Sequence, residues 1–413
     1  MKQETASRFF GISPSAGEGI EPARDRRLLW DVPDRRLDET SAAAVDGLDL
    51  LRSLLEIPSL SGQEAAAAAF LADWMGRHGL RAFVDAVGNA VGIVDGGPAA
   101  DGSPPQDVVL LGHIDTVGGH VPVRVEEGKL YGRGAVDAKG PLAAFAVAAA
   151  MVGPRPGWRI VVIAAVEEEA ATSRGARHAA AQYRPAYCVI GEPSGWSRVT
   201  LGYKGRLLAH VAVRQPMSHT AGPAPSACEL AVDLWNRVRS RVAELNAGRD
   251  KPWDQVLASL RSFSSDSDGL TETAQMMLGF RLPPDIGPEA LQAELQALAG
   301  PAELAFEGAE VAYRADKNNA LVRAFLAAIR AQGGQPGFVL KTGTSDMNVV
   351  GPIWRCPIVA YGPGDSSLDH TPHEHVAIEE WQRGVAVLVD MLQRVTAGQA
   401  AADEAVVGQA AAE

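Results

Sequence analysis

Apolar runs alternate with helical patterns along the first half of the chain. In "VDGLDLLRSLLEIPS", leucines recur at Leu48, Leu51, Leu54 and Leu55, which is the spacing of one buried helix face, and Pro58 ends the pattern. The predicted segments that follow are helix 61–79, strands 81–85, 90–94 and 107–111, helix 138–151, strand 159–166, helix 174–182 and strand 187–190. Apolar, β-branched strands between helices predict an α/β sheet that is covered on both faces.

The helix predicted for residues 61–79 carries its own start and stop signals. Ser61 precedes the apolar pattern and can serve as the N-cap, and Glu64 stands three residues later, as in a capping box. Gly79 ends the pattern.

The pattern changes near residue 205. "RLLAHVAV" alternates apolar and polar residues as a strand exposed on one face does. The segments predicted after it are helix 226–245, strands 256–264 and 272–282, helix 288–299 and strand 303–312. This β-α-β-β-α-β order predicts a separate, ferredoxin-like α+β unit. The α/β pattern then returns in helix 320–332, strand 357–360 and helix 378–395.

The sequence therefore predicts an α/β domain with a mixed sheet that is interrupted by an insertion. The main domain covers residues 46–204 and 311–396, and the inserted domain covers residues 205–310. We expect residues 1–45 to form a flexible extension and the alanine-rich residues 397–413 to form a disordered tail.

Composition and charge exclude several classes of protein. The 413 residues are 46% hydrophobic and 21% charged, with a net charge of −12 and no block of Lys or Arg, which argues against a nucleic-acid or anionic membrane partner. No apolar stretch approaches the ~18 residues of a membrane span, and residues 1–45 lack the apolar core of a signal peptide. The three cysteines lie far apart without CxxC spacing, which predicts a reduced, cytoplasmic protein.

Polar side chains with metal-binding chemistry follow the ends of the predicted strands. They are His113, Asp115, Asp137, Glu167, Glu168, Glu169, Glu192 and His370. In open α/β sheets, ligands bind in the crevice outside the carboxyl ends of the strands. Two imidazoles and several carboxylates without a thiolate suit Zn²⁺, Co²⁺ or Mn²⁺, and they are too many for one tetrahedral ion. The set fits two ions that share one carboxylate, with one further carboxylate as general base.

Each of these residues also has a plainer interpretation. His113 could be a loop histidine, Asp137 could cap the helix that starts near residue 138, and the run 167–169 could be a solvated turn. Three acids directly after a buried strand place at least one of them at the end of the sheet, where like charges need a cation. The joint pattern therefore favours the metal site.

Six motifs occurring in order resemble the M20 family of metallopeptidases and amidohydrolases. They are "GHIDTV", "GRGAVDAKG", "EEE…GAR", "GEPS", "SHTAGP" and "LDHTPHEHV". The resemblance implies a zinc-peptidase-like domain with two zinc ions, for which cobalt could substitute. One ion would bind His113, Asp137 and Glu192, and the other would bind Glu169, His370 and the shared Asp137. It further implies that Asp115 orients His113 and that Glu168 is the general base.

One departure from the family pattern concerns the acids after the strand 159–166. The family usually has two acids followed by a glycine, whereas this chain has three acids followed by Ala170 and Ala171. The assignment of Glu168 as base and Glu169 as ligand rests on their spacing from Asp137.

The resemblance also makes the insertion a lid and dimerisation domain of a homodimer. His219 in "SHTAGP" matches a histidine that reaches into the partner subunit's site and stabilises the oxyanion. Arg281 matches a lid arginine that binds a substrate carboxylate. The loop Lys341, Thr342, Gly343 and Thr344 resembles one that contacts substrate.

Within the family, "LGYKGRL", "KTGTSDMNVVGP" and "GPGDSSLDHTPHEHV" resemble a subgroup that acts on a small acidic carrier protein. The implied reaction releases lysine, or ornithine, from the carrier's terminal glutamate, as the last step of carrier-linked lysine or arginine biosynthesis. Basic residues near the site loops could face such a carrier or could be ordinary solvated charges, namely Arg174, Arg177, Lys204, Arg206 and Lys317. The alternatives are a deacylase of the acetylornithine or succinyl-diaminopimelate type, a dipeptidase, and a metal-binding dimeric scaffold without catalysis.

Overall fold

The computed structural model describes residues 47–410, with side chains described for residues 47–397. The flexible extension predicted for residues 1–45 lies outside the described residues. Within residues 47–410, no helix is both long enough and apolar enough to span a membrane.

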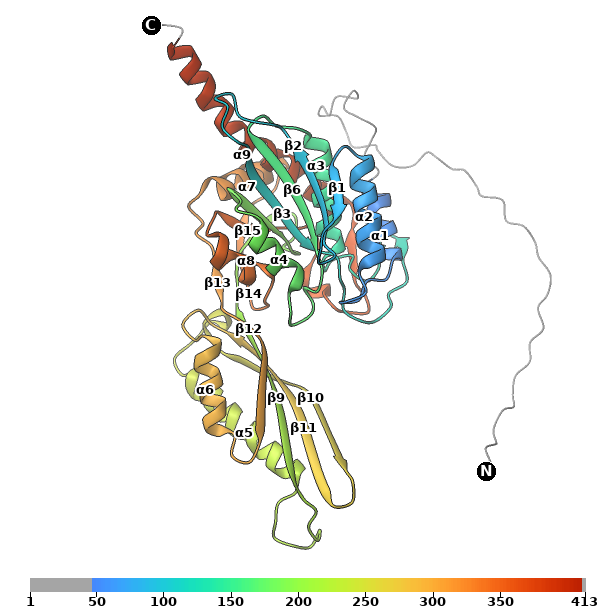
Figure 1. Ribbon diagram of the computed structural model, residues 1–413, viewed down its shortest axis with the longest axis vertical. Coiled ribbons are helices and arrows are strands. Elements are labelled where there is room, and N and C mark those ends of the chain that lie inside the picture. The colour runs from blue at the N-terminus through green and yellow to red at the C-terminus, as the bar shows by residue number, and fades with distance from the viewer. Residues whose placement is uncertain (1–46, 411–413) are drawn as a thin grey trace, which may run out of the picture. The chain divides into compact units, whose positions relative to one another are not determined.

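A mixed sheet of nine strands forms the centre of the described main domain (Figure 1). In order across the sheet, the strands are β1 (Arg81–Val84), β2 (Ala90–Asp95), β6 (Trp158–Ala165), β3 (Gln106–His113), β7 (Tyr187–Gly191), β15 (Ile358–Ala360), β8 (Arg198–Tyr203) and β13 (Tyr313–Arg314), with β14 (Gly337–Lys341) paired to β8. The central strands β6, β3, β7 and β15 are parallel, so their carboxyl ends meet at one edge.

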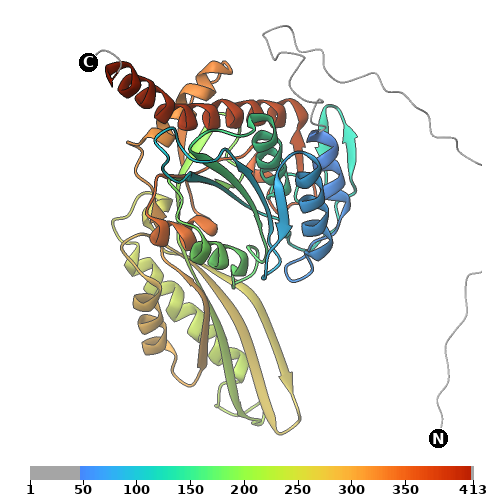
Figure 2. The same cartoon turned by 45° about the horizontal axis from the view of Figure 1, so that its top comes forward.

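Helices cover both faces of this sheet, as the apolar strands predict. Val108 and Leu110 of β3 belong to a core shared with α1 (Gly47–Glu56), α2 (Ala65–Arg77), α3 (Lys139–Val152), α7 (Ala320–Ala331) and α9 (Ile378–Ala410). Val109 and Leu111 face the opposite core, beneath α4 (Arg174–Gln182) and α8 (Asp346–Trp354). Because successive strand residues point to opposite faces, a strand buried on both sides must be apolar throughout. Figure 2 shows α9 beside α3 on the first face.

The inserted unit is an antiparallel sheet with two helices, and it follows the predicted β-α-β-β-α-β order. Its elements along the chain are β9 (Gly205–Pro216), α5 (Ala227–Leu245), a short 3₁₀ turn (Pro252–Asp254), β10 (Leu257–Ser267), β11 (Thr271–Leu282), α6 (Pro288–Leu298) and β12 (Glu303–Glu310). The strands lie in the order β10-β11-β9-β12, which is the ferredoxin-like arrangement. Leu207, Val211, Leu278 and Phe280 pack beneath the helices in a core of their own. The predicted fold class is confirmed.

The insertion leaves and rejoins the main domain at neighbouring strands. It begins directly after β8, and the chain returns as β13, whose Tyr313 pairs with Tyr203 of β8. Lys204 at the departure point is fully buried, and its ammonium donates hydrogen bonds to the carbonyls of Pro252, Trp253 and Gln255. Lys204 therefore fixes the base of the insertion. The sequence suggested that it could face a carrier protein, but its ammonium is occupied by these hydrogen bonds.

Several elements differ from the predictions. The short strands β4 (Arg124–Glu126), β5 (Lys129–Tyr131) and β16 (His375–Ala377) form a small sheet that was not predicted, nor were β8, β13, β14 and α8. β4, β5, β13 and β16 have only two or three residues each, which is too few to show a period. α9 continues to Ala410, beyond the predicted end at Val395, in a stretch whose many alanines have high helix propensity.

The capping box predicted for α2 is wrong. Its N-cap is Glu64 without a side-chain hydrogen bond, and the Ser61 hydroxyl donates instead to Asp115, at 2.7 Å. Helix α3 likewise begins after Ala138 without a side-chain cap, so Asp137 is not used as one. The side chains of Ser61 and Asp137 instead lie at the edge of the sheet that is described next.

Candidate active site

The strand ends deliver the predicted metal ligands to one edge of the large sheet. His113 is the last residue of β3, Glu168 and Glu169 follow β6, and Glu192 follows β7. Asp137 and His370 come from loops before α3 and β16. The apolar residues of each strand are held in the two cores, so the first polar residues beyond them emerge at the same crevice.

Asp137 lies between the two histidines. Its Oδ1 is 3.2 Å from Nε2 of His113, and its Oδ2 is 3.0 Å from Nε2 of His370. Glu192 Oε1 lies 3.9 Å from His113 Nε2, and Glu169 Oε1 lies 2.8 Å from His370 Nε2. The structure therefore brings together two groups, each with one histidine and one glutamate, that share the Asp137 carboxylate. This is the arrangement that a dinuclear site requires.

Burial and mutual repulsion act on the carboxylates of this cluster. Burial raises the pKa values of Glu168 and Glu192 well above their ordinary range, and neighbouring carboxylates push both higher. Burial also raises the pKa of Glu169. Burial alone would raise the pKa of Asp137 too, but hydrogen bonding to His113 and His370 holds it below its ordinary value. A buried cluster of acids held this close needs a compensating cation.

The donor set fits divalent metal ions. Ligand atoms of His113, Glu168 and Glu192 lie within 4.8 Å of one another, as do those of His113, Asp137 and Glu169. Nitrogen and carboxylate oxygen donors without a thiolate match the preferences of Zn²⁺ and its neighbours.

The three consecutive acids after β6 take different directions. The Glu167 carboxylate turns away from the cluster, where it pairs with Arg174 at 2.8 Å and accepts a hydrogen bond from Thr172. Glu168 Oε2 instead lies 4.0 Å from Nε2 of His113, and Glu169 contacts His370. The structure thus brings residues 168 and 169 into the cluster, as the spacing from Asp137 predicts, and leaves Glu167 outside it.

Asp115 is fully buried and holds two parts of the cluster together. Its carbonyl oxygen lies 3.0 Å from Nδ1 of His113, and its carboxylate Oδ1 lies 3.5 Å from the same nitrogen. The carboxylate also accepts hydrogen bonds from the backbone N–H groups of Glu168 and Glu169, at 3.1 and 3.0 Å, and from Ser61. Asp115 therefore orients the acid loop as well as His113, and only the second role was predicted.

Glu374 is a residue of the site that the sequence did not reveal. Its carboxylate is fully buried, and Oε1 accepts hydrogen bonds from the backbone N–H groups of Gly134, Val136 and Asp137, at 3.0, 3.0 and 3.1 Å. Oε2 accepts from Arg133 at 2.6 Å. One side chain thus ties the loop that carries Asp137 to the segment that follows His370. An acid between two histidines in "HEH" was the available signal.

Two further buried ionisable groups lie close to the cluster and were also missed. Lys139 donates hydrogen bonds to the carbonyls of Leu54 and Ile57, at 2.9 and 2.7 Å, and so joins the end of α1 to the start of α3. Asp346 begins α8, and burial raises its pKa to about 7.

The predicted substrate-contacting residues have different surroundings. Lys341 ends β14, and its charge acts on Glu192, whereas Thr342 and Gly343 occupy the bend that follows. The Thr344 hydroxyl donates to the Lys204 carbonyl at 2.9 Å, so it fastens the loop to the base of the insertion. Arg281 lies on β11 and lines a pocket of the inserted sheet.

His219 lies away from the cluster of its own chain. It occupies the exposed turn between β9 and α5, where its ring nitrogen accepts a hydrogen bond from the Ala221 N–H. Within the described residues, no hydrogen bond or ion pair joins it to a predicted ligand. β9 starts near the acid loop, since Arg206 donates to the Ala171 carbonyl at 3.4 Å. Its 12 residues then extend over about 36 Å before the turn is reached.

The chain matches one family profile and several known proteins. The sequence profile of peptidase family M20/M25/M40 matches residues 109–394, more than half of the chain. The LysW-lysine hydrolase of Deinococcus radiodurans is 50% identical over 358 residues, which cover 85% of this chain and 97% of that protein. The LysW-lysine/LysW-ornithine hydrolase of Sulfurisphaera tokodaii is 31% identical over 278 residues, covering 66% and 77% respectively.

Solved structures share the fold at low sequence identity. The M20 family metallo-carboxypeptidase Sso-CP2 of Sulfolobus solfataricus superposes with a TM-score of 0.69 at 17% identity, covering 85% of this chain and 99% of that one. Human carnosine dipeptidase 1 superposes with a TM-score of 0.67 at 16% identity, covering 85% of this chain and 97% of that one. With the profile match over most of the chain and a relative at half identity along nearly its whole length, the chain belongs to the M20/M25/M40 family of peptidases.

Proposed function

We propose that this protein is a metal-dependent hydrolase that releases lysine from the terminal glutamate of a small acidic carrier protein. The position of Asp137 between His113 and His370 is the observation that supports the chemistry. The substrate follows from the 50% identity to a LysW-lysine hydrolase, which extends over 97% of that relative. Ornithine is the related substrate, since more distant relatives are named for both amino acids. The reaction would be the last step of carrier-linked lysine synthesis, or of arginine synthesis for ornithine, in the cytoplasm.

Two Zn²⁺ ions fit the donor set, and Co²⁺ is the alternative. His113 and Glu192 would hold one ion, Glu169 and His370 would hold the other, and Asp137 would be shared. When bound, the ions activate a water molecule and polarise the amide carbonyl.

Glu168 is the proposed general base. Its carboxylate lies in the cluster beside His113 and is held there through the hydrogen bond from its own backbone N–H to Asp115. It takes the proton of the attacking water and passes that proton to the amine of the leaving lysine. Burial raises the pKa of Glu168 and so increases its basicity, which strengthens a carboxylate as a proton acceptor.

His219 is proposed to act in the site of a second copy of the chain. The length of β9 separates it from the cluster of its own chain, so a contribution to catalysis requires a homodimer. An imidazole donor aimed at the carbonyl oxygen would stabilise the negative charge that develops there.

The test is the pair of variants Glu168→Ala and Glu167→Gln, assayed with lysine-loaded carrier. We expect Glu168→Ala to lose turnover by about 10²- to 10⁴-fold while two metal ions remain bound per chain. Glu167→Gln is the matched control, because the Glu167 side chain leaves the cluster for Arg174. Near wild-type turnover of Glu168→Ala would remove it as the base.

Parallel assays with acetylornithine, succinyl-diaminopimelate and a dipeptide panel test the substrate. Turnover of a small substrate equal to that of the loaded carrier would replace the carrier proposal with a deacylase or dipeptidase. Two bound metal ions per chain without hydrolysis of any amide would indicate a binding scaffold instead.

A further inference from the structure

The segment between α1 and α2 contacts three loops that carry residues of the candidate site. The Ile57 carbonyl accepts a hydrogen bond from the ammonium of Lys139, at the start of α3. The Ser59 hydroxyl donates to the carbonyl of Ile114, just after β3, at 2.7 Å. Glu64 makes the third contact, with the loop of acids that follows β6. One short segment therefore supports three separate parts of the site.

Glu64 is a buried carboxylate that binds backbone N–H groups. The residue is 4% exposed, and its Oε1 accepts hydrogen bonds from the N–H groups of Gly62, at 2.8 Å, and Glu167, at 3.1 Å. The first bond closes a local turn, whereas the second joins segments 103 residues apart. Burying a carboxylate is unfavourable unless hydrogen bonds compensate for the lost hydration. The contact with Glu167 is therefore a built feature of the fold.

Four consecutive backbone N–H groups at the end of β6 donate to side-chain oxygens. The acceptors belong to three side chains that lie far away in sequence. In chain order, the donors and acceptors are Val166 to Asn89, Glu167 to Glu64, and both Glu168 and Glu169 to Asp115. Because each main-chain N–H is held at a fixed point, these acceptors set the path of the backbone.

The backbone at Glu167 has a left-handed conformation, with φ at +59°. This conformation is strained for any residue except glycine and persists only where the surroundings impose it. The turn separates neighbouring acids, since the Glu167 carboxylate leaves for Arg174, whereas Glu168 Oε2 lies 4.0 Å from Nε2 of His113. The N–H of the strained residue is the one that Glu64 accepts.

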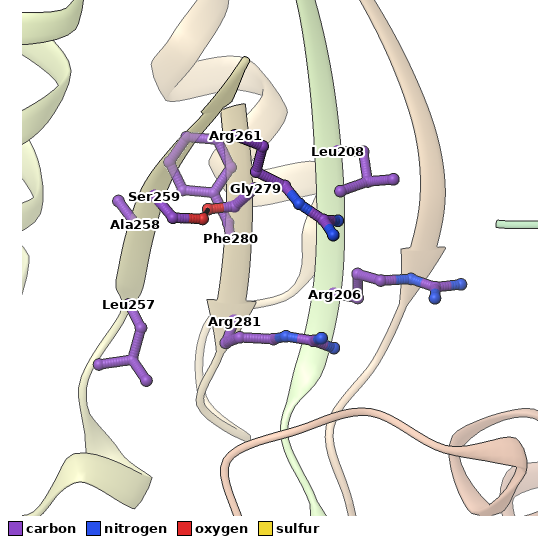
Figure 3. A pocket seen from close by; sticks show the side chains of 9 residues that line it. All are labelled: Arg206, Leu208, Leu257, Ala258, Ser259, Arg261, Gly279, Phe280 and Arg281. Atoms are coloured by element: carbon purple, nitrogen blue, oxygen red, sulfur yellow. Dashed lines mark hydrogen bonds between the residues drawn. The ribbon is translucent and has the colours of Figure 1, made fainter. Parts of the chain in front are cut away.

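The far end of the acid loop has a weaker contact. Figure 3 shows Arg206 extending from the inserted sheet, and its guanidinium donates to the Ala171 carbonyl at 3.4 Å, near the limit for a hydrogen bond. The contact of Glu64 with Glu167 is shorter and is strengthened by the charge of the carboxylate. The direction of the loop is therefore set at its start.

We propose that Glu64 is a positioning residue for the general base. By holding the N–H of Glu167, it fixes the left-handed turn that directs Glu168 into the cluster. The inference rests on the proposed role of Glu168 in hydrolysis and adds the residue that orients it. Glu64 acts through the backbone, so its oxygen atom is required and its negative charge only strengthens the bond.

The first experiment compares substitutions of Glu64 at saturating Zn²⁺ and substrate. We expect Glu64→Ala to lower kcat about 10- to 100-fold, with KM within about twofold and unchanged metal content, because the base acts only in the chemical step. Glu64→Gln should keep kcat within about threefold of wild type, because its amide oxygen accepts the same N–H groups. Glu64→Asp keeps the charge but withdraws it by one carbon–carbon bond, so it should lose kcat even if Glu64→Ala does not fold.

Ser59→Ala is the matched control for a loss of stability. It also removes a buried hydrogen bond of the segment between α1 and α2, but that bond ends at Ile114 and not at the acid loop. We expect its kcat to stay near wild type. Wild-type kcat in both Glu64→Ala and Glu64→Asp, or an equal loss of kcat in Ser59→Ala, would overturn the proposal.

A double variant tests the left-handed turn directly. Glycine adopts this conformation without strain. Glu167 lies outside the cluster, so Glu167→Gly alone should leave kcat close to wild type. Added to Glu64→Ala or Glu64→Asp, it should raise kcat about five- to tenfold, because the turn then needs less support. No gain in the double variant would contradict the role of the turn.

Hydrogen exchange of the backbone amides separates this proposal from the proposed function. In Zn²⁺-loaded protein, Glu64→Ala should speed exchange at residues 167–169 about tenfold, the equivalent of one hydrogen bond, and Glu64→Gln should not. If the loaded carrier is not hydrolysed but exchange changes in this way, the positioning role stands and the function fails. If the carrier is hydrolysed, and Glu64→Ala changes neither kcat nor exchange, the function stands and the positioning role fails.

Discussion

Glu374→Gln isolates the contribution of a buried carboxylate that touches no predicted metal ion. The substitution keeps the size of the side chain. The amide oxygen can still accept from the N–H groups of Gly134, Val136 and Asp137, but the amide nitrogen must then face the Arg133 guanidinium. In the variant, an amide N–H donor therefore faces the N–H donors of Arg133. The three backbone N–H groups keep an acceptor, but it no longer carries a negative charge.

The magnitude follows from these contacts. Breaking a buried ion pair at one partner costs about 3–5 kcal/mol of unfolding free energy. The loop that moves carries Asp137, whose N–H is bonded to Glu374 at 3.1 Å. Removing a group that supports a metal ligand typically weakens metal binding about 10- to 100-fold. We expect both effects in Glu374→Gln.

The assay must separate metal affinity from general destabilisation. Zn²⁺ affinity is measured by competition with a chromophoric chelator, and stability is measured by urea unfolding of the metal-free protein. Asp107→Asn is the matched control, because Asp107 is also buried and accepts two hydrogen bonds from Arg159, at 2.7 and 2.9 Å. Asp107 lies near the start of β3, and His113 of the candidate metal site lies at its other end. If Glu374→Gln and Asp107→Asn lose similar stability and both keep wild-type Zn²⁺ affinity, Glu374 does not position Asp137.

Three further outcomes are expected. Removal of metal by a chelator should lower the unfolding free energy by about 4 kcal/mol, relative to protein in Zn²⁺ at a thousand times its Kd. The reason is that the acids of the cluster lose the cation that compensates their charge. Calorimetric scans should show that added Zn²⁺ restores the stability. His219→Ala should lose about 10²- to 10³-fold in kcat. If the histidine acts across a dimer, mixing this variant with Glu168→Ala should recover activity, because one site of the mixed dimer then has both residues. No recovery after subunit exchange contradicts that arrangement. Burial lowers the pKa of Lys204 from 10.5 to about 8, so unfolding takes up a proton between these values and the unfolding free energy should rise with pH there. The unfolding free energies of the wild type and of Lys204→Met are measured by denaturation from pH 8 to 10. The same pH dependence in both proteins would refute this.

The parts of the site that the sequence revealed are those where a buried strand ends. His113 and Glu192 stand out because apolar runs stop directly before them, and the sheet topology then brings these ends together. In the sequence, only the spacing from Asp137 favoured Glu168 and Glu169 over Glu167 as residues of the site. In the structure, an ion pair with Arg174 holds the Glu167 carboxylate away from the cluster.

The supporting contacts could not be predicted because their partners are distant in sequence and carry no pattern. The Glu374 carboxylate binds backbone N–H groups near residue 134, and any residue but proline supplies such a donor. Ser61 was misassigned because a local capping signal competes with a tertiary partner, and the Asp115 carboxylate receives the hydroxyl instead. Lys204 resembled a surface charge, although three carbonyls surround its ammonium.

The pairing of Tyr203 with Tyr313 bears on how the gene for such a protein can change. Both ends of the inserted segment lie on adjacent, hydrogen-bonded strands, so a tight turn in its place would close the gap without removing any ladder bond of the large sheet. A single excision could thus produce a smaller protein that keeps the five predicted metal ligands but lacks both Arg281 and His219. The predicted metal ligands and the two insertion residues predicted to contact substrate are therefore encoded in stretches of the gene that recombination can separate.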